Sequence, residues 1–401
     1  MANTNFSLRV NCLTFNHSKY IEDCLNGFCI QQTDFQFICT IIDDASTDGE
    51  QDVINNYLDE HFDMDGLALL PDLYVGETDY EAMEQRNKHL AEHTAPWRCD
   101  AAEGIYTFVQ HKTNKNCYVL SLNLKKNLYG IADSKVKLIA PWDNAKYIAL
   151  CEGDDYWTDP LKLQKQVDVM RKCANVGICF GRTKLYYQET GEYREIYDSN
   201  SYVGLMRRDE FSKWNCLGRY LHARSDLSIG VIHTSSTLVR RSAAYEVGVS
   251  KYGDIAKWRI RFGDTLLFQL AAVNADVFFL PDVVSIYRRQ PNSLTHVNST
   301  GVMRDAYCVF APYFLIKQFN CSAVDATHFL RKQIFEVWCQ YIRDSGRKNI
   351  RYILMSWCLL KIFLAPRHIF DFVILMLGIK NSLLGRISRR YRNLIDSLYG
   401  S

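Results

Sequence analysis

The segment ALCEGDDYWTDP, residues 149–160, begins as an apolar run and ends abruptly at two adjacent aspartates, Asp154 and Asp155. The same pattern occurs in FICTIIDDASTDG, residues 37–49, where an earlier apolar run also ends on an aspartate pair. Neighbouring carboxylates repel each other, and a buried carboxylate without a partner is costly. One such pair is a simple turn, but two pairs, each closing an apolar run, predict a shared site.

The first 60 residues alternate between strand-like and helical patterns. Residues 6–15 are strand-like, 18–31 and 53–58 place apolar residues on one helical face, and 35–42 are nearly all apolar, as in a strand covered on both faces. This order of strand, helix, strand and helix predicts a parallel sheet with crossover helices, and therefore an α/β fold.

Later segments extend this expected sheet. Further strands are predicted at 118–124, 137–140, 146–151, 176–187, 231–239 and 277–287, and further helices at 81–93 and 264–272. Thr158 is expected to cap a helix that has Pro160 in its first turn. Residues 62–116 are largely polar and look like an insertion rather than a core element.

The composition narrows the class of protein. With 401 residues, 48% of them hydrophobic and 23% charged, the chain is an ordinary globular protein with room for two or three domains. The net charge of +2 gives no reason to expect a nucleic-acid partner. None of the 14 cysteines forms a CxxC pair, which predicts reduced core thiols rather than zinc ligands. The N-terminus has no signal-peptide pattern, so a cytoplasmic location is expected.

The C-terminal region has a different character. Residues 352–364 and 369–379 are strongly apolar, but each is shorter than the roughly 20 residues of a spanning helix. Lysines and arginines flank both segments, which is typical of helices that lie on an anionic membrane surface. We therefore expect residues 350–392 to bind the inner face of the cytoplasmic membrane. The alternative is a helical hairpin packed on the catalytic domain or on the partner in a homodimer.

The two aspartate pairs suggest a bound cation. Ligands of open parallel sheets bind beyond the carboxyl ends of the strands, where both pairs should lie. Mg²⁺ or Mn²⁺ typically binds one or two carboxylates together with substrate phosphates. The chain contains neither GxxxxGK[ST] nor GxGxxG, which argues against a P-loop enzyme or a dinucleotide dehydrogenase. Metal and side chains must then neutralise the phosphates.

A family resemblance rests on three stretches: LTFNHSKYIEDCLNGFCIQQ, FQFICTIIDDASTDG and YIALCEGDDYWTDPLKLQKQ. Together they resemble the nucleotide-sugar-binding half of the family 2 glycosyltransferases, which have the GT-A fold. The resemblance covers about residues 7–58 and 117–172 and continues at 231–241, 261–271 and 282–293. It implies a GT-A domain at 1–300, with a nucleotide-sugar half at about 1–172 that includes the insert 62–116, an acceptor half at 173–300, and a helical region at 301–401.

The resemblance also implies roles for individual residues. Thr14 and Asn16 would lie at the nucleotide, Asp44 would contact the base, and Asp43 would support that loop. Asp154 and Asp155 match the metal motif, with Asp155 as the expected direct ligand of Mn²⁺ or Mg²⁺ on the diphosphate. Asp264 matches the catalytic base of inverting members, and Lys135 would lie near the diphosphate. The implied donor is a UDP-sugar, and the implied acceptor is a hydroxyl of a glycan or a lipid-linked saccharide.

Two departures from the family pattern refine this expectation. Members often carry Y-R-x-H where this chain reads Tyr287-Arg288-Arg289-Gln290, so the histidine is replaced by Gln290. The Q-x-x-R-W element of processive synthases is absent. A single-addition transferase is therefore favoured over a polymerising enzyme. The resemblance and the C-terminal region further imply a hexosyltransferase of the bacterial surface-polysaccharide type.

Several alternatives stay open at this stage. A nucleotidyltransferase would normally carry a glycine-rich phosphate loop near its N-terminus, and residues 11–19 contain none. A glycoside hydrolase also uses paired carboxylates but needs neither metal nor nucleotide. An inactive binding protein with a GT-A-like fold is the third alternative. Among single residues, Asp264 would also suit a helix N-cap, Trp157 a core position, and Thr234-Ser235-Ser236 either an acceptor site or a strand end.

Overall fold

The computed structural model describes residues 6–73, 80–129, 135, 138–196, 203–206, 232–243, 268 and 275–290. The chain divides into two units, Met1–Pro291 and Asn292–Ser401, and all the described residues lie in the first. The expected helical region at 301–401 and nearly all of the expected helix at 264–272 thus fall outside the described residues.

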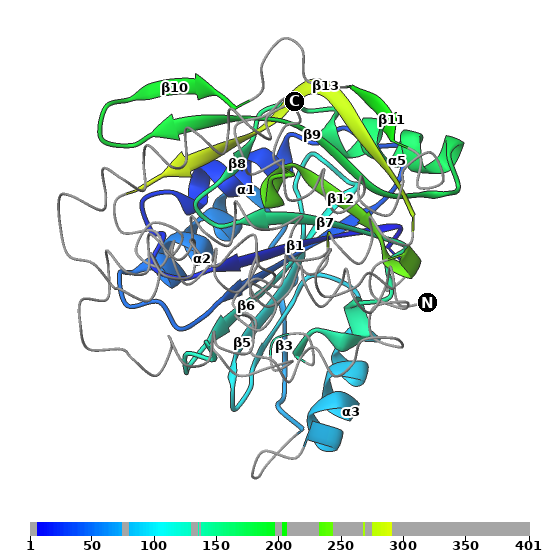
Figure 1. Ribbon diagram of the computed structural model, residues 1–401. Coiled ribbons are helices and arrows are strands. Elements are labelled where there is room, and N and C mark those ends of the chain that lie inside the picture. Colours follow the sequence, from blue (N-terminus) through cyan, green and yellow to red (C-terminus); the bar gives the residue numbers. More distant parts are fainter. Residues whose placement is uncertain are drawn as a thin grey trace, which may run out of the picture. The chain divides into compact units, whose positions relative to one another are not determined.

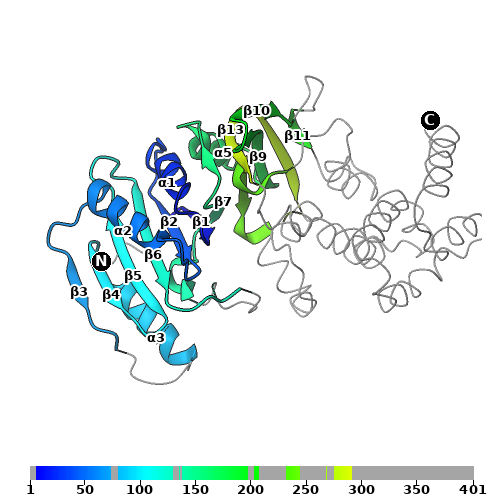
Figure 2. The ribbon, with the colours of Figure 1, turned by 90° about the vertical axis from the view of Figure 1, so that its left-hand side faces the viewer.

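The described residues form one mixed sheet flanked by helices, in the order β11-β13-β9-β12-β7-β1-β2-β6-β5-β4-β3 (Figures 1 and 2). Its central strands, which run parallel, are β6 (Cys117–Leu124), β2 (Phe37–Asp43), β1 (Leu8–Thr14) and β7 (Tyr147–Glu152). The α/β fold expected from the alternating patterns is therefore confirmed.

The flanks of the sheet contain most of the antiparallel pairs. On one side lie β3 (Ala68–Leu70), β4 (Trp97–Asp100) and β5 (Gly104–Gln110). On the other side lie β8 (Tyr156–Trp157), β9 (Val176–Tyr187), β10 (Glu192–Glu195), β11 (Gly204–Met206), β12 (Thr237–Arg240) and β13 (Asp276–Arg289). The long strands β9 and β13 pair in parallel, and β8 pairs with β13.

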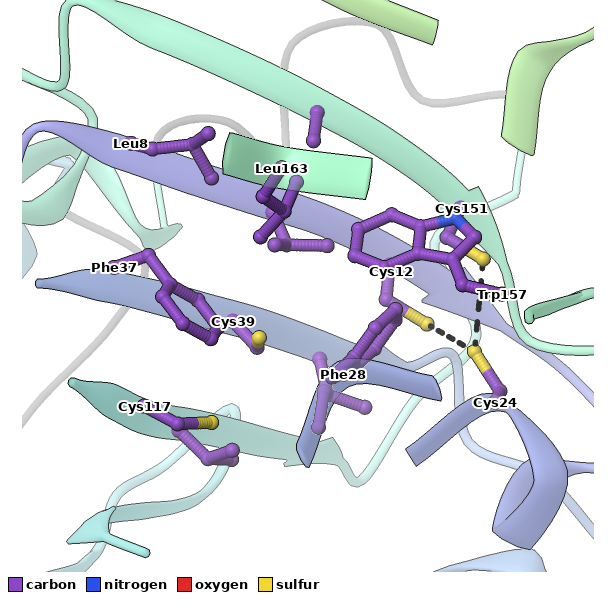
Figure 3. Close-up of a cluster of buried hydrophobic side chains, with 14 of the residues drawn as sticks. Leu8, Cys12, Cys24, Phe28, Phe37, Cys39, Cys117, Cys151, Trp157 and Leu163 are labelled. Atoms are coloured by element: carbon purple, nitrogen blue, oxygen red, sulfur yellow. Dashed lines mark hydrogen bonds between the residues drawn. The ribbon is translucent and has the colours of Figure 1, made fainter. Parts of the chain in front are cut away.

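Both faces of the central strands are covered, because successive side chains of a strand point to opposite faces. Phe37, Cys39 and Ile41 of β2 join the core beneath α1 (Ile21–Cys29), α2 (Glu50–His61) and α5 (Lys162–Lys172), part of which Figure 3 shows. Ile38 and Ile42 face a second core beneath α3 (Tyr80–Ala91) and the 3₁₀ helix η1 (Ala140–Trp142). Burial on both faces explains why β2 is apolar throughout.

The segment 62–116 is part of this architecture, contrary to the expectation of a peripheral insert. β5 pairs with β6 along seven residues, and β4 and β3 continue the sheet beyond it. Trp97, Tyr106 and Phe108 lie buried in the second core. The polar helix α3, close to the predicted helix at 81–93, dominates the composition of the segment and hides the short strands around it.

Two local predictions were wrong. The segment expected to be a strand at 137–140 leads into the 3₁₀ helix η1 instead. Thr158 does not cap α5, because the helix begins only at Lys162, with Leu161 in the N-cap position, while the amide of Thr158 donates to the carbonyl of Val284 in β13 (3.3 Å). The carboxylate of Asp159 accepts the amide of Leu161 instead (2.9 Å).

None of the helices in the described part of the chain has the length and apolar character needed to span a bilayer.

Candidate functional site

The end of β1 holds both aspartate loops. The amide of Asp44 donates to the carbonyl of Thr14 (3.0 Å), and the amide of Gly153 donates to the carbonyl of Leu13 (3.1 Å). In the sheet register Thr14 lies beside Asp43, and Leu13 lies beside Glu152. Both acidic loops therefore leave the same edge of the sheet and meet at adjacent carbonyl groups of one strand.

The loop after β2 is fixed by its own carboxylates. Asp43 accepts hydrogen bonds from the amide of Ser46 (2.9 Å) and from the side chain of Gln51 (2.6 Å). Asp44 is buried and accepts from the amide of Leu128 (2.7 Å) and from the ammonium of Lys135 (2.7 Å). Lys135 thus lies against Asp44, and both oxygens of Asp44 are engaged by the protein.

The residues that follow β1 turn back onto this loop. Asn16 adopts a left-handed backbone (φ 59°), and its side-chain oxygen accepts the amide of Thr47 (2.8 Å). The hydroxyl of Thr14 donates to the carboxylate of Glu50, which also accepts the amide of His17 (2.8 Å). Burial raises the pKa of Glu50, while the hydrogen bonds that it accepts oppose the shift. These contacts tie β1 to the start of α2.

Asp155 lies inside the protein and not at its surface. One of its oxygens accepts the backbone amide of Arg288 (3.0 Å), and the other accepts the hydroxyl of Ser235, which belongs to the 3₁₀ helix η2 (Thr234–Ser236). Burial raises the pKa of Asp155 well above its ordinary value, and the charge of Asp154 adds to that shift. In this geometry Asp155 joins η2 to β13, and neither oxygen is directed to solvent.

Asp154 is the accessible member of the pair, with 14% of its side chain exposed. Its Oδ2 accepts a hydrogen bond from Gln290 (3.0 Å) and lies 3.8 Å from Nε2 of His17. Gln290 occupies the place of the histidine in the family's Y-R-x-H pattern. The residue at this position therefore faces Asp154 with an amide side chain.

Arg288 fixes the loop between β7 and β8. Its Nε donates to the carbonyl of Asp154 (3.0 Å), and its Nη2 pairs with Asp23 of α1 (2.6 Å). The guanidinium also lies within 6 Å of three aromatic rings, those of Tyr20, Tyr156 and Tyr186. A planar cation held by fixed acceptors and aromatic faces is well ordered, so it keeps the Asp154 loop in place.

Two residues left open by the sequence have core positions. Trp157 is 2% exposed, donates its indole N–H to the carbonyl of Ser235 (2.6 Å) and packs edge-on against Phe28 (Figure 3). Ser235 and Ser236 are buried. Trp157 is therefore a core anchor rather than a sugar platform, and Ser235 positions Asp155 rather than lining an acceptor site.

The donor set around Asp154 fits a hard or borderline divalent cation. Glu152 is exposed and Asp154 is partly exposed on the same loop, and His17 approaches from the residues that follow β1. Within the described ranges, no three or more His, Cys, Asp or Glu residues form a metal-binding group. A cation here would have few protein ligands and would complete its coordination with water and phosphate oxygens.

The structure brings together seven of the predicted site residues at one sheet edge: Thr14, Asn16, Asp43, Asp44, Lys135, Asp154 and Asp155. Asp264, the predicted base, lies outside the described residues. The sequence reasoning missed His17 and Glu50 as members of the site, because their partners lie far away in the chain. The sequence did single out Gln290, as the residue that replaces the histidine of the Y-R-x-H pattern beginning at Tyr287. Its hydrogen bond to Asp154 was not predicted.

No protein-family model matches the chain. It is similar to uncharacterized proteins of Mycobacterium bovis and Mycobacterium tuberculosis, with 26% identity over 284 residues, covering 71% of this chain and 59% of each relative. The chain thus spans about three fifths of the length of the curated relatives it matches.

Solved structures offer a distant likeness. S. aureus TarS 1-349 in complex with UDP-GlcNAc has 14% identity and a TM-score of 0.47, with 86% of this chain and 77% of that chain covered. Mannosyltransferase PcManGT from Pyrobaculum calidifontis, in complex with GDP-Man and Mn²⁺, has 12% identity and a TM-score of 0.39, with 93% and 86% covered. TM-scores below 0.5 assign no function to this chain.

Proposed function

We propose that this protein is a non-processive, inverting, metal-dependent glycosyltransferase of family 2, which transfers a hexosyl group from a UDP-sugar to a hydroxyl of a glycan or lipid-linked acceptor. The observation that carries the proposal is the meeting of two acidic loops at the end of β1. The loop of Asp43 and Asp44 is bound to the carbonyl of Thr14, and the loop of Gly153 and Asp154 is bound to the carbonyl of Leu13.

Each part of the site has a task in this reaction. A carboxylate-bound cation would neutralise the charge that develops on the leaving nucleoside diphosphate. Asp154 is proposed as the carboxylate that holds it, because Asp155, the ligand expected from the sequence, has both oxygens engaged inside the protein. Thr14, Asn16 and the Asp44 loop would bind the nucleotide.

The acceptor side of the proposal rests on the sequence. Asp264 is proposed as the base that takes the proton of the acceptor hydroxyl as its oxygen attacks the anomeric carbon. Lys135 is proposed to lie near the diphosphate of the donor, and its ion pair with Asp44 supports a position at the β2 end of the site. Holding both reactants in line should contribute several powers of ten in rate.

Calorimetry tests this proposal. Full-length protein is titrated with UDP, GDP and dTDP, with and without Mn²⁺, and the expected result is UDP binding that Mn²⁺ strengthens. Asp154→Asn should remove the effect of Mn²⁺, whereas Asp100→Asn, which changes an exposed carboxylate on β4, should leave it intact. If the affinity for nucleotide were the same with and without Mn²⁺, and the same in Asp154→Asn as in the wild type, the metal-dependent mechanism would be refuted.

We further propose that residues 350–392 bind an anionic membrane surface. Full-length protein should co-sediment with vesicles that contain anionic lipid, and replacing Arg386, Arg389 and Arg390 by Gln should weaken this binding. Equal sedimentation with neutral and anionic vesicles would contradict the proposal.

A further inference from the structure

His17 lies between the two acidic loops, and the transfer chemistry proposed above does not use it. Its Nδ1 is 3.1 Å from the hydroxyl oxygen of Thr14, and its Nε2 is 3.8 Å from Oδ2 of Asp154. The side chain is 23% exposed, so one edge of the ring can still be reached by a small ligand. The ring thus bridges the end of β1 and the loop after β7.

The contacts of Thr14 fix the tautomer of this histidine. A threonine hydroxyl has a single hydrogen, and here it is donated to Glu50. The Thr14 oxygen can then only accept a hydrogen bond from His17. Nδ1 of His17 therefore carries a hydrogen, and in the neutral imidazole Nε2 keeps a lone pair on the side of Asp154.

Glu50 anchors this chain of contacts. It is fully buried, and it accepts hydrogen bonds from Thr14, from the amide of His17 (2.8 Å) and from the hydroxyl of Ser46 (2.9 Å). Ligating histidines in metal sites are usually oriented in this way, through a hydrogen bond from the ring nitrogen that does not face the metal.

Two electron-rich atoms consequently face each other across the site. Nε2 of His17 and Oδ2 of Asp154 are too far apart, at 3.8 Å, for a direct hydrogen bond. Gln290 holds Oδ2 from the other side (3.0 Å). Neighbouring ligands of one octahedral ion, at metal–ligand distances of about 2.0–2.2 Å, lie roughly 3 Å apart, so the two atoms would approach each other by less than about 1 Å on binding an ion.

We propose that Nε2 of His17 and the carboxylate of Asp154 bind one divalent cation, and that the imidazole makes this site prefer Mn²⁺ to Mg²⁺. The proposal deepens the proposed function, on which it rests for the phosphates that complete the coordination. Imidazole suits transition-metal ions, whereas Mg²⁺ favours oxygen ligands.

Pulsed electron paramagnetic resonance of Mn²⁺ bound to the full-length protein tests the ligand directly. The expected spectrum shows coupling to a ¹⁴N nucleus, which is the signature of a coordinated imidazole. His17→Asn should remove this coupling and weaken Mn²⁺ binding at least about tenfold, while Mg²⁺ binding changes less. The substitution spares the backbone amide that contacts Glu50, so folding should be retained.

His89→Asn is the matched control. His89 of α3 also lies 3.8 Å from a carboxylate, that of Glu92, but at an exposed position away from the site. This variant should keep both the ¹⁴N coupling and the affinity for Mn²⁺.

Two results separate this inference from the proposed function. In one outcome, UDP binding depends on Mn²⁺, the spectrum shows no ¹⁴N coupling, and His17→Asn binds UDP and Mn²⁺ as the wild type does. This outcome would overturn the role of the histidine and leave the proposed function intact. Absence of UDP binding under all conditions would refute the proposed function, while the ¹⁴N coupling of Mn²⁺ alone would still decide the role of His17.

Discussion

Gly153→Ala should disrupt the site by a purely steric effect. A Cβ at this position would lie 2.1 Å from Oγ1 of Thr14, 2.5 Å from its Cβ and 3.2 Å from Nδ1 of His17. Gly153 is not among the described glycines with positive φ, so alanine adds no backbone strain. Ordinary van der Waals contact begins near 3.4 Å, and Thr14 and the Asp154 loop must therefore separate by about 1 Å or more.

The magnitude follows from this displacement. Overpacking of this kind costs about 1–3 kcal/mol of folding free energy. For a domain of this size that corresponds to a fall in Tm of roughly 2–12 °C. A shift of about 1 Å in a reacting group reduces turnover about 100-fold. We therefore expect a modest loss of stability and a much larger loss of activity.

The assay combines thermal unfolding with calorimetry of UDP and Mn²⁺ binding and with the rate at which UDP is released from a UDP-sugar donor. Gly181→Ala is the control, because its Cβ would meet the methyl groups of Val284 at 2.6 and 2.8 Å, within the β9–β13 pair. It should lower stability without changing nucleotide binding. If Gly153→Ala folds and binds UDP and Mn²⁺ as the wild type does, the inferred contact between the two loops is wrong.

Two further predictions concern buried polar groups. Burial lowers the pKa of Lys162 from 10.5 to about 7, so the unfolded chain binds more protons between these values and stability falls as the pH drops through that window. As the pH rises from about 7 to about 9, Lys162 should add about 2 kcal/mol to the free energy of unfolding, measured by urea titration. Lys162→Met should abolish this increment. If the free energy of unfolding of the variant still rose with pH as in the wild type, the prediction would be wrong. Ser235→Ala should cost about 1–3 kcal/mol because it leaves an oxygen of Asp155 without its donor, whereas Ser285→Ala, which removes a hydroxyl pair with Thr183, should cost less. Equal losses of unfolding free energy in the two serine variants would show that Asp155 does not depend on Ser235.

Much of the fold could be predicted from local patterns. The apolar runs that became β1, β2 and β7 are strands buried on both faces, and α1 follows the spacing of Ile21, Cys24 and Phe28. The aspartate pairs marked the ends of β2 and β7, since a buried strand ends where charge begins. These features depend on neighbours in the sequence, which is why the sequence reveals them.

The features that were missed depend on distant partners. Thr158 has the residue type of an N-cap, but its amide pairs with β13 and α5 begins only at Lys162. The sequence predicts Asp155 as a metal ligand but gives no sign of its hydrogen bond with Ser235, 80 residues away. Within 62–116, β3 and β4 were missed because they have only three and four residues, and the seven residues of β5 were missed because the segment was judged by its polar composition as a whole.

The most direct test of the central claim is an anomalous-difference map from crystals of the protein grown with UDP and Mn²⁺. We predict one Mn²⁺ peak between Asp154 and the diphosphate of UDP, at the edge of the sheet where β1, β2 and β7 end. UDP or Mn²⁺ bound only at another part of the molecule, with this edge empty, would contradict the account.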